Sequence, residues 1–160
     1  EKIPGRLVMV ATSVGLAPYM PILKELETRS FPEVVLLLGV RDRSEFIYGD
    51  VLKDYAQRHD YIELRLCLSR GKATAGYEHD GYVNAQIERL GVNPESDHFL
   101  LCGNPEMIDD AWGYLKKSGF KAKNVVREKY VFARESRSSA KALTAEHKQL
   151  IADKLKKYGK

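Results

Sequence analysis

Residues 98–110 read HFLLCGNPEMIDD and carry the clearest structural signal in the chain. An apolar run at residues 99–102 stops at Gly103, and Asn104-Pro105 then opens an acidic first turn of the kind that begins a helix. We therefore predict a buried strand, a tight turn and a helix N-terminus. Parallel α/β sheets bind ligands at the carboxyl ends of their strands. Cys102, the last side chain before the turn, is thus predicted to line a site, with an inert buried cysteine as the alternative.

The same pattern recurs along the chain, where apolar or alternating runs end in turn residues and give way to helical periodicity. Strands are predicted at residues 7–11, 33–40, 61–69, 99–102 and 124–130. Helices are predicted between them at residues 17–28, 45–59, 83–90 and 105–118. This alternation predicts an α/β fold with a doubly wound, five-stranded parallel sheet in three layers, of the Rossmann-like type. An extra, basic amphipathic helix is predicted at residues 140–158.

The composition is that of an ordinary globular domain, with 44% hydrophobic and 30% charged residues in a chain of 160. No apolar run reaches the ~18–20 residues of a membrane-spanning helix. Cys67 and Cys102 both fall in predicted strands, and we expect reduced thiols in a cytoplasmic protein. The net charge of +4 identifies no partner, and a lysine-rich helix is weak support for nucleic-acid binding. We expect no nucleic-acid partner, no membrane span and no metal site.

A short loop links the first predicted strand to its helix. Residues 11–18 read ATSVGLAP. Backbone N–H groups at such a helix start can accept a pyrophosphate, so the loop is a candidate dinucleotide site. A plain tight turn is the alternative.

Cationic groups gather at the ends of the second and third predicted strands. Residues 39–41 read GVR, and residues 69–72 read SRGK. A guanidinium, an ammonium and a hydroxyl within four residues suit a dianion. Arg41 belongs either to the same site or to a solvated loop.

Several segments, taken in order, resemble the pyridine-nucleotide-binding (C-terminal) domain of the ferredoxin–NADP reductase family of flavoprotein reductases. LLCGNPEM resembles the family's C-G-x-P-x-M segment. ATSVGLAP resembles its T-G-T-G-[IL]-A-P loop, with Ser13 in place of the usual glycine and Val14 in place of the usual threonine. The resemblance spans residues 7–130 and extends to GVR at 39–41, LSR at 68–70, GYVN at 81–84 and EKY at 128–130.

The resemblance implies binding residues for two parts of NADP(H). The pyrophosphate region is implied at Thr12, Val14, Gly15 and Pro18. The adenosine 2′-phosphate end is implied at Arg41, Ser69, Arg70, Lys72 and Tyr82. The two arginines and the lysine favour NADP over NAD.

The resemblance also implies the nicotinamide end, at Cys102, Gly103, Pro105 and Met107. In relatives, an aromatic residue at the exit of the last strand lies against the flavin, and an acid two residues before it helps to position the nicotinamide. Cys102, Glu128 and Tyr130 are therefore the expected catalytic residues. A surface acid and an edge-strand tyrosine are the alternative at the last strand.

A second cofactor, FAD, is implied mainly on an N-terminal barrel domain, whose R-x-[YF]-[ST] motif is absent from this sequence. We expect a linker at residues 1–6, an NADP-binding domain at 7–132, and a polar linker with the basic helix at 133–160. Hydride would pass between NADP(H) and FAD, and electrons would reach ferredoxin or flavodoxin. The chain alone is expected to be inactive without its flavin domain. The alternatives are an NADH-dependent oxygenase-type reductase domain and a non-catalytic nucleotide-binding or interaction module.

Overall fold

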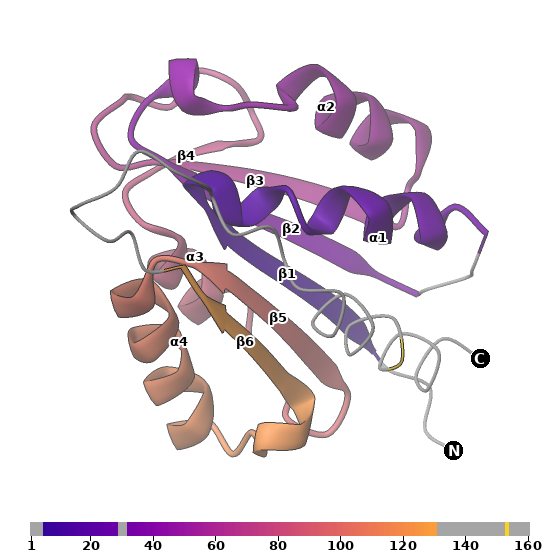
Figure 1. Ribbon diagram of the computed structural model, residues 1–160, viewed down its shortest axis with the longest axis vertical. Coiled ribbons are helices and arrows are strands. Elements are labelled where there is room, and N and C mark those ends of the chain that lie inside the picture. The colour runs from indigo at the N-terminus through magenta and orange to yellow at the C-terminus, as the bar shows by residue number, and fades with distance from the viewer. Residues whose placement is uncertain (1–4, 29–31, 131–152, 154–160) are drawn as a thin grey trace.

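The computed structural model describes residues 5–28, 32–130 and 153. The first two ranges form a parallel sheet with helices on both faces (Figure 1). The strands are β1 (Arg6–Thr12), β2 (Val34–Val40), β3 (Ile62–Leu68), β4 (Glu78–Asp80), β5 (Asp97–Gly103) and β6 (Val125–Lys129). The helices are α1 (Tyr19–Leu26), α2 (Gly49–Arg58), α3 (Val83–Arg89) and α4 (Pro105–Lys117), with 3-10 turns η1 (Ser13–Leu16), η2 (Arg43–Glu45) and η3 (Ala122–Asn124). All strand pairs are parallel, in the order β4-β3-β2-β1-β5-β6. The predicted doubly wound α/β fold is confirmed.

The described sheet has six strands, so the predicted number of five is wrong. The additional strand, β4, lies in a segment predicted as a loop and pairs with β3 from Leu66↔Glu78 to Leu68↔Asp80. Its three residues are all polar or charged and have no apolar alternation, so their pattern does not indicate a strand. After β3 the chain folds back through residues 69–77 and returns along the outer edge of the sheet.

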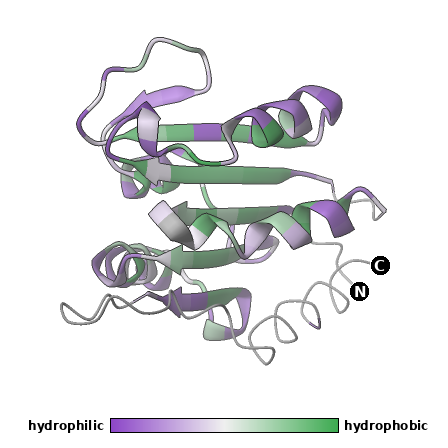
Figure 2. Ribbon diagram, turned by 45° about the horizontal axis from the view of Figure 1, so that its top comes forward, coloured by the Kyte–Doolittle hydropathy of each residue, from purple (hydrophilic) through white to green (hydrophobic). Residues whose placement is uncertain are grey.

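The helices α1 and α2 cover one face of the sheet, and α3 and α4 cover the other (Figure 1). The side chains of β3 alternate between the two faces, since Leu64 and Leu66 pack toward α1 and α2 while Cys67 packs toward α3. The central strands β1 and β2 are apolar on both faces, and Figure 2 shows this band of hydrophobic residues between the two helical layers. Burial of this band on both faces is the main contribution to the stability of the fold.

The helix predicted at residues 45–59 begins later, at Gly49. Tyr48 has a φ of 60°, in the left-handed region, which a right-handed helix cannot include. Asp42 caps the η2 turn, because its carboxylate accepts a hydrogen bond from the Ser44 N–H at 2.9 Å. The chain between β2 and α2 is therefore a structured loop at the carboxyl edge of the sheet.

Arg6, the last residue of the predicted linker, already belongs to β1 and forms an ion pair of 2.7 Å with buried Asp97. The C-terminal helix predicted at residues 140–158 lies outside the described residues, apart from Asp153. Within the described ranges, none of the helices has the length and apolar character that a membrane crossing requires.

Candidate functional site

The order of the strands changes direction between β1 and β5. From β1 the chain adds β2, β3 and β4 on one side of the sheet, and it then crosses over to add β5 and β6 on the other. In open α/β sheets, ligands bind at the carboxyl ends of such a strand pair. The η1 turn follows β1 and the Gly103-Asn104 turn follows β5. Two of the predicted ligand-binding motifs therefore meet at the switch point of the fold.

Gly15, in η1, lies directly against the end of β5. A Cβ atom added at this glycine would stand 2.5 Å from the Cys102 carbonyl oxygen and 3.0 Å from the Gly103 Cα. Both neighbours are backbone atoms that no side-chain rotation can remove. The glycine is therefore required by the close approach of the two loops, whether or not a ligand is bound.

Thr12 joins the same two loops by a hydrogen bond. Its hydroxyl oxygen accepts the Asn104 N–H at 2.9 Å. Gly103 has a φ of 129°, and a Cβ atom there would collide with the Thr12 hydroxyl. Asn104 caps α4, because its side-chain oxygen accepts the Met107 N–H at 3.2 Å. The turn after β5 is thus fixed relative to the loop after β1, with the start of α4 at the edge.

Ser13 adopts the backbone conformation for which glycine is favoured. Its φ of 51° lies in the left-handed region, which costs a residue with a side chain about 1 kcal/mol. Glycine, the family's usual residue at this position, would adopt this conformation without the local strain that Ser13 carries. Val14, the second departure, lies in η1.

Two predicted binding residues have buried side chains. Pro18 is buried just before α1. Met107 is buried in the core between the sheet and α3 and α4, and its N–H already binds Asn104. Pro105 is half-buried at the first position of α4. These residues can shape the loops, but the structure does not place the Pro18 and Met107 side chains at the surface of the edge.

The structure brings the three predicted catalytic residues together on the face covered by α1. Cys102 lies opposite Glu128 in the β5–β6 register. The Tyr130 N–H donates to the Gly103 carbonyl at 2.8 Å, and the Tyr130 hydroxyl lies beside the Cys102 thiol. Burial, and then the neighbouring Cys102 thiol, raises the pKa of Tyr130 above its ordinary value, so its hydroxyl remains protonated at neutral pH.

Tyr19 supports this cluster from within the core. Its buried hydroxyl lies 2.7 Å from the Val10 carbonyl oxygen and 2.6 Å from the Leu100 carbonyl oxygen. Burial raises the pKa of Tyr19 well above its ordinary value, so the hydroxyl stays protonated. Its single proton can be donated to the backbone of either switch-point strand, β1 or β5. Nothing in the local sequence distinguishes this tyrosine from an ordinary core aromatic residue.

Both cysteines are free, and burial raises the pKa of each thiol to about 12. The thiolate is the reactive form of cysteine, and Cys102 is only 3% exposed. We therefore expect neither Cys67 nor Cys102 to react within minutes with an aromatic disulfide reagent at pH 8 in the native chain. Both are expected to react at once when the chain is unfolded in urea. Rapid labelling of one thiol in the native state, followed by absorbance, would contradict this prediction.

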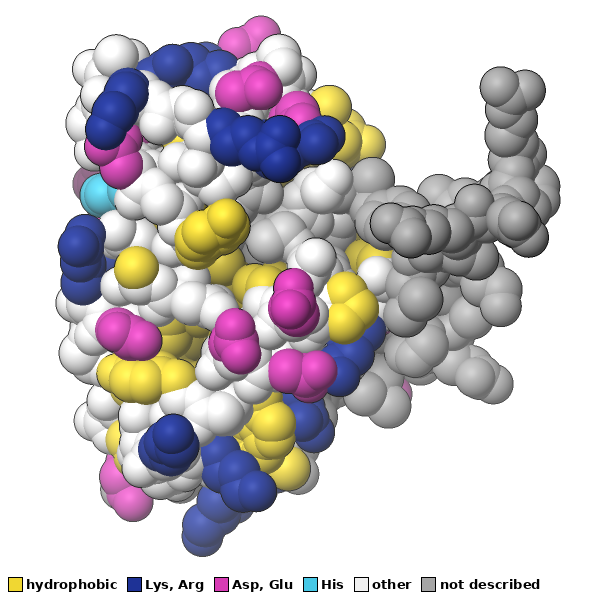
Figure 3. Space-filling view, turned by 90° about the vertical axis from the view of Figure 1, so that its left-hand side faces the viewer, with side chains coloured by type: hydrophobic (Ala, Val, Ile, Leu, Met, Phe, Trp, Pro, Cys, Tyr) yellow, Lys and Arg dark blue, Asp and Glu magenta, His cyan; other side chains and the backbone are white. Residues whose placement is uncertain are grey.

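The second group of predicted residues lies at the carboxyl ends of β2 and β3. The Ser69 N–H donates to the Val40 carbonyl at 3.0 Å, and the Arg70 N–H donates to the Arg41 carbonyl at 2.9 Å. These bonds extend the β2–β3 pairing and set Arg70 beside Arg41. Figure 3 looks onto this edge, where Lys and Arg side chains gather at the top, over the loops after β2 and β3. Asp and Glu side chains stand among them and gather again across the middle of this face, and a second group of Lys and Arg side chains lies at the bottom.

Acidic neighbours partly neutralise the cationic end. The Arg41 guanidinium binds Glu45, with 2.7 Å between Nε and the carboxylate oxygen. The pKa of Asp42 is lowered, first by hydrogen bonds from Ser44 and also by the charges of Arg41 and Arg70. The Arg70 side chain makes no hydrogen bond or ion pair with the described part of the chain, so its guanidinium is available to a ligand.

Lys72 and Tyr82 complete this end of the edge. The Lys72 ammonium lies 3.4 Å from the Asp80 carboxylate and is 89% exposed. Tyr82 is 73% exposed at the start of α3, where Gly81, with a φ of 98°, turns the chain out of β4. The five residues predicted for the 2′-phosphate end therefore share one end of the carboxyl edge.

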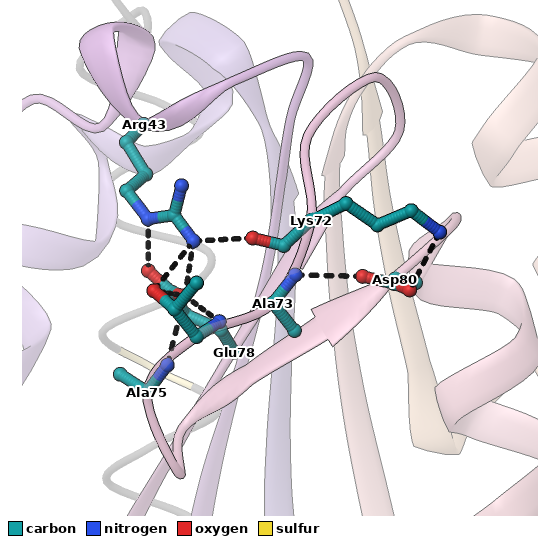
Figure 4. Close-up of polar contacts among 7 residues, drawn as sticks. Arg43, Lys72, Ala73, Ala75, Glu78 and Asp80 are labelled. Carbon is teal, nitrogen blue, oxygen red and sulfur yellow. Dashed lines mark hydrogen bonds and ion pairs between the residues drawn. The ribbon is translucent and has the colours of Figure 1, made fainter.

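An ion pair that the sequence does not single out lies beneath them (Figure 4). The Arg43 guanidinium binds Glu78 through two hydrogen bonds of 2.6 Å, from Nε and Nη2 to the two carboxylate oxygens. Nη2 also donates to the Lys72 carbonyl and, at 2.9 Å, to the Thr74 hydroxyl. Arg43 comes from the loop after β2 and its partners from the segment after β3, so the ion pair connects two loops of the edge.

The acid stability of the fold is expected to depend on Glu78. Hydrogen bonds from Arg43, and then from the Thr74 N–H, hold the pKa of this carboxyl well below its ordinary value of 4.5. A lowered pKa in the folded state stabilises the fold fully above the unfolded pKa, and this contribution is lost as the pH falls toward the folded pKa. Glu78→Gln should therefore be less stable than the wild type at pH 7, with a difference that shrinks below about pH 4.5. Urea unfolding at several pH values measures it, with exposed Glu88→Gln as the control, and a pH-independent difference would contradict the prediction.

Sequence reasoning misses Arg43 and Glu78 because they are 35 positions apart and each lies in a polar segment. Their contact depends on β4, which has no sequence signal of its own. In the part of the chain that the structure describes, no group of three or more His, Cys, Asp or Glu side chains could hold a metal ion.

The sequence profile of the oxidoreductase NAD-binding domain family matches residues 9–112. Ferredoxin–NADP reductase of Azotobacter vinelandii is 27% identical over 136 residues, which cover 76% of this chain and 53% of the relative. The electron transfer component of toluate 1,2-dioxygenase from Pseudomonas putida is 26% identical over 131 residues, which cover 81% of this chain and 38% of the relative.

Among solved structures, a ferredoxin NADP+ reductase from Neisseria gonorrhoeae with bound FAD and NADP matches with a TM-score of 0.68 and 26% identity. The match covers 79% of this chain and 56% of that one. The chain spans about half the length of the ferredoxin–NADP reductases that it matches. It therefore belongs to the oxidoreductase NAD-binding domain family, as a pyridine-nucleotide-binding domain of the ferredoxin–NADP reductase type.

Proposed function

We propose that the chain binds NADP(H) across the carboxyl edge of its sheet and presents the nicotinamide to FAD held on a separate domain. Ferredoxin or flavodoxin is the proposed electron carrier. The observation that carries the proposal is the junction of the β1 and β5 loops at the switch point, fixed by the Thr12–Asn104 hydrogen bond. The proposal of a flavin domain is supported by the Neisseria relative, which contains FAD and NADP and of which this chain covers 56%.

The distribution of charge along the edge supports one orientation of the dinucleotide. Arg41, Arg70 and Lys72 provide positive charge at the end formed by β2 and β3. Acidic side chains of α4 follow β5 on the other side of the switch point, with Glu106 in the first turn and Asp109 paired with Lys129 at 2.6 Å. A 2′-phosphate is a dianion and the oxidised nicotinamide ring is a cation, so each end of NADP+ meets a group of opposite charge. Gly15 and Gly103 allow the two central loops to approach each other closely between these ends.

The bound dinucleotide supplies or accepts the hydride, and this chain positions its ring. Cys102 keeps its proton because its pKa is about 12, so it meets the ring as an uncharged, polarisable group. The Tyr130 hydroxyl lies beside the Cys102 thiol, and the Tyr130 N–H holds the Gly103 carbonyl. Glu128 is the acid nearest to this pair in the β5–β6 register. Binding and orientation are therefore the proposed contribution of the chain to catalysis.

Calorimetric titration of the chain with 2′-phospho-AMP and, in parallel, with AMP tests the proposed ligand. We expect 2′-phospho-AMP to bind at least ~10-fold more tightly, because charge-assisted hydrogen bonds to the phosphate add to those that AMP makes. This preference should weaken as salt is added. Equal affinity for both would point to NADH, and no binding of either would overturn the proposal of a nucleotide site.

An NADH-dependent oxygenase-type reductase domain is the second candidate, and Asp42 favours it. This carboxylate follows β2 directly, and its lowered pKa keeps it ionised at neutral pH. An acid at the end of the second strand can bind the ribose hydroxyls of NAD and repel a 2′-phosphate. The similarity to the electron transfer component of toluate 1,2-dioxygenase also supports an oxygenase-type reductase domain. Under this alternative, AMP would bind as tightly as 2′-phospho-AMP.

The hydride-transfer part of the proposal concerns Cys102. In a reductase that contains this domain together with its flavin domain, Cys102→Ser is expected to slow hydride transfer at least ~10-fold, because small errors in ring position reduce the rate strongly. Affinity for 2′-phospho-AMP should change by less than about twofold, since the adenosine end is distant. Stopped-flow absorbance of the flavin measures the rate. Cys67→Ala, on the opposite face of the sheet, is the matched control, and an unchanged rate for Cys102→Ser would remove this residue from the mechanism.

A further inference from the structure

We propose that Arg43 and Glu78 are positioning residues for nucleotide specificity. Their ion pair holds the segment between β3 and β4, residues 69–77, so that Arg70 and Lys72 face the 2′-phosphate. The inference rests on the proposed function and extends it to two residues that are not themselves proposed to contact the ligand.

The Glu78 carboxylate organises the return of the chain toward β4. One of its oxygens accepts the Thr74 N–H at 2.7 Å, the Ala75 N–H at 3.1 Å and the Thr74 hydroxyl at 3.2 Å. Glu78 is 6% exposed, so its charge has little access to water and requires these partners. The carboxylate therefore fixes the backbone of the return turn from inside the loop.

Arg43 connects this turn to the neighbouring loop. Its two hydrogen bonds to Glu78 form the bidentate arrangement that fixes the guanidinium plane. From this position Nη2 reaches the Lys72 carbonyl, as Figure 4 shows. The backbone of a predicted phosphate-binding residue is thus held by a side chain from the loop after β2. Nε and Nη2 of Arg43 are engaged by these partners. Its proposed effect on ligand binding is therefore indirect, through the position of the loop that carries Arg70 and Lys72.

Two further bonds hold the opposite side of the loop. The Asp80 carboxylate accepts the Ala73 N–H at 2.7 Å, and the Arg70 N–H binds the Arg41 carbonyl at 2.9 Å. The backbone that carries Arg70 and Lys72 is therefore ordered before any ligand arrives. Such preorganisation lowers the entropy cost of binding, and its loss weakens the contacts made by that loop. The switch point depends on a separate bond, between Thr12 and Asn104, so it should be unaffected.

The test is calorimetric titration of the whole chain and of Arg43→Met, Glu78→Gln and the double variant, with 2′-phospho-AMP and with AMP. Each single variant is expected to bind 2′-phospho-AMP about tenfold more weakly while AMP affinity changes by less than about twofold. The double variant should resemble the single ones, because the two residues act as a unit. Arg43→Lys, which restores the charge without the bidentate contact, should recover part of the selectivity.

Arg58→Met is the matched control. Arg58 is also half-exposed and pairs with two acids, Asp54 and Glu27, but it lies at the far end of α2. The Arg58→Met variant removes the same charge as Arg43→Met and should leave the preference for 2′-phospho-AMP over AMP at the wild-type value.

Wild-type selectivity in Arg43→Met and Glu78→Gln, together with its loss in Arg70→Ala, would overturn the inference and leave the proposed function intact. An equal loss of affinity for 2′-phospho-AMP and for AMP would also overturn the inference, because it would show a general structural role. Additive losses of affinity in the double variant would overturn it as well, because the two residues would then not act as a unit. A wild-type chain that does not distinguish the two ligands would contradict the proposed NADP site itself, and the inference would fall with it.

Discussion

Gly15→Ala is expected to lower the free energy of unfolding by about 3 kcal/mol. The added methyl group would stand 2.5 Å from the Cys102 carbonyl oxygen, well inside van der Waals contact. The obstacle is backbone on both sides, so either η1 or the end of β5 has to move. The same movement would separate the two loops of the switch point and weaken nucleotide binding. Urea unfolding followed by circular dichroism measures the change in stability.

Gly113→Ala provides the matched control for this substitution. Gly113 lies within α4, and no described atom outside the adjoining turns of its own helix stands within 4 Å of a Cβ atom built there. Alanine is the better helix former, so this variant should be about 0.5–1 kcal/mol more stable than the wild type. If Gly15→Ala were as stable as the wild type while Gly113→Ala behaved as expected, the close approach of η1 to β5 would be contradicted.

Arg70→Ala is expected to reduce the affinity for 2′-phospho-AMP by roughly 10–100-fold, the effect of losing a hydrogen-bonded charge. The Arg70 backbone is fixed by its bond to Arg41, and its guanidinium has no hydrogen bond or ion pair within the described ranges. Removing the side chain therefore takes away a ligand contact without breaking a structural one. AMP affinity should remain within about twofold of the wild type. Calorimetric titration with both ligands measures the two effects.

The control for Arg70→Ala is Arg89→Ala, which removes an exposed positive charge from the last turn of α3. It should leave the affinity for both ligands unchanged. If both variants lost affinity for 2′-phospho-AMP equally, the effect would come from the overall charge of the domain. If neither did, the assignment of Arg70 to the 2′-phosphate would be wrong.

Local patterns predicted most of the fold because they follow directly from backbone geometry. The alternation in β3 places Leu64 and Cys67 on opposite faces, as a period of two requires. Pro105 marks the first residue of α4, because its fixed φ and missing N–H suit a helix start. The cationic groups after the second and third predicted strands gather for the same reason, since parallel strands bring their carboxyl ends to one edge. The resemblance to the family, and not a local pattern, implied Tyr82 and the 2′-phosphate role of this group.

The structural details that local patterns missed depend on distant partners. Strand β4 exists because the edge of β3 is available for pairing, and its own three residues carry no signal. The role of Tyr19 depends on the Leu100 carbonyl, 81 positions away. Met107 was predicted at the ligand edge from its motif, but its place in α4 turns the side chain into the core.

By itself, the sequence determined the class of fold, the strands and helices with strong periodicity, and the edge of the sheet at which the predicted site residues gather. These features depend on periodicity and turn chemistry within a few residues. Only the tertiary structure decided that Thr12 joins the two switch-point loops and that Arg43 binds Glu78 beneath Arg70 and Lys72. Such contacts depend on the register of strands that are far apart in the chain, and a local pattern carries no information about that register.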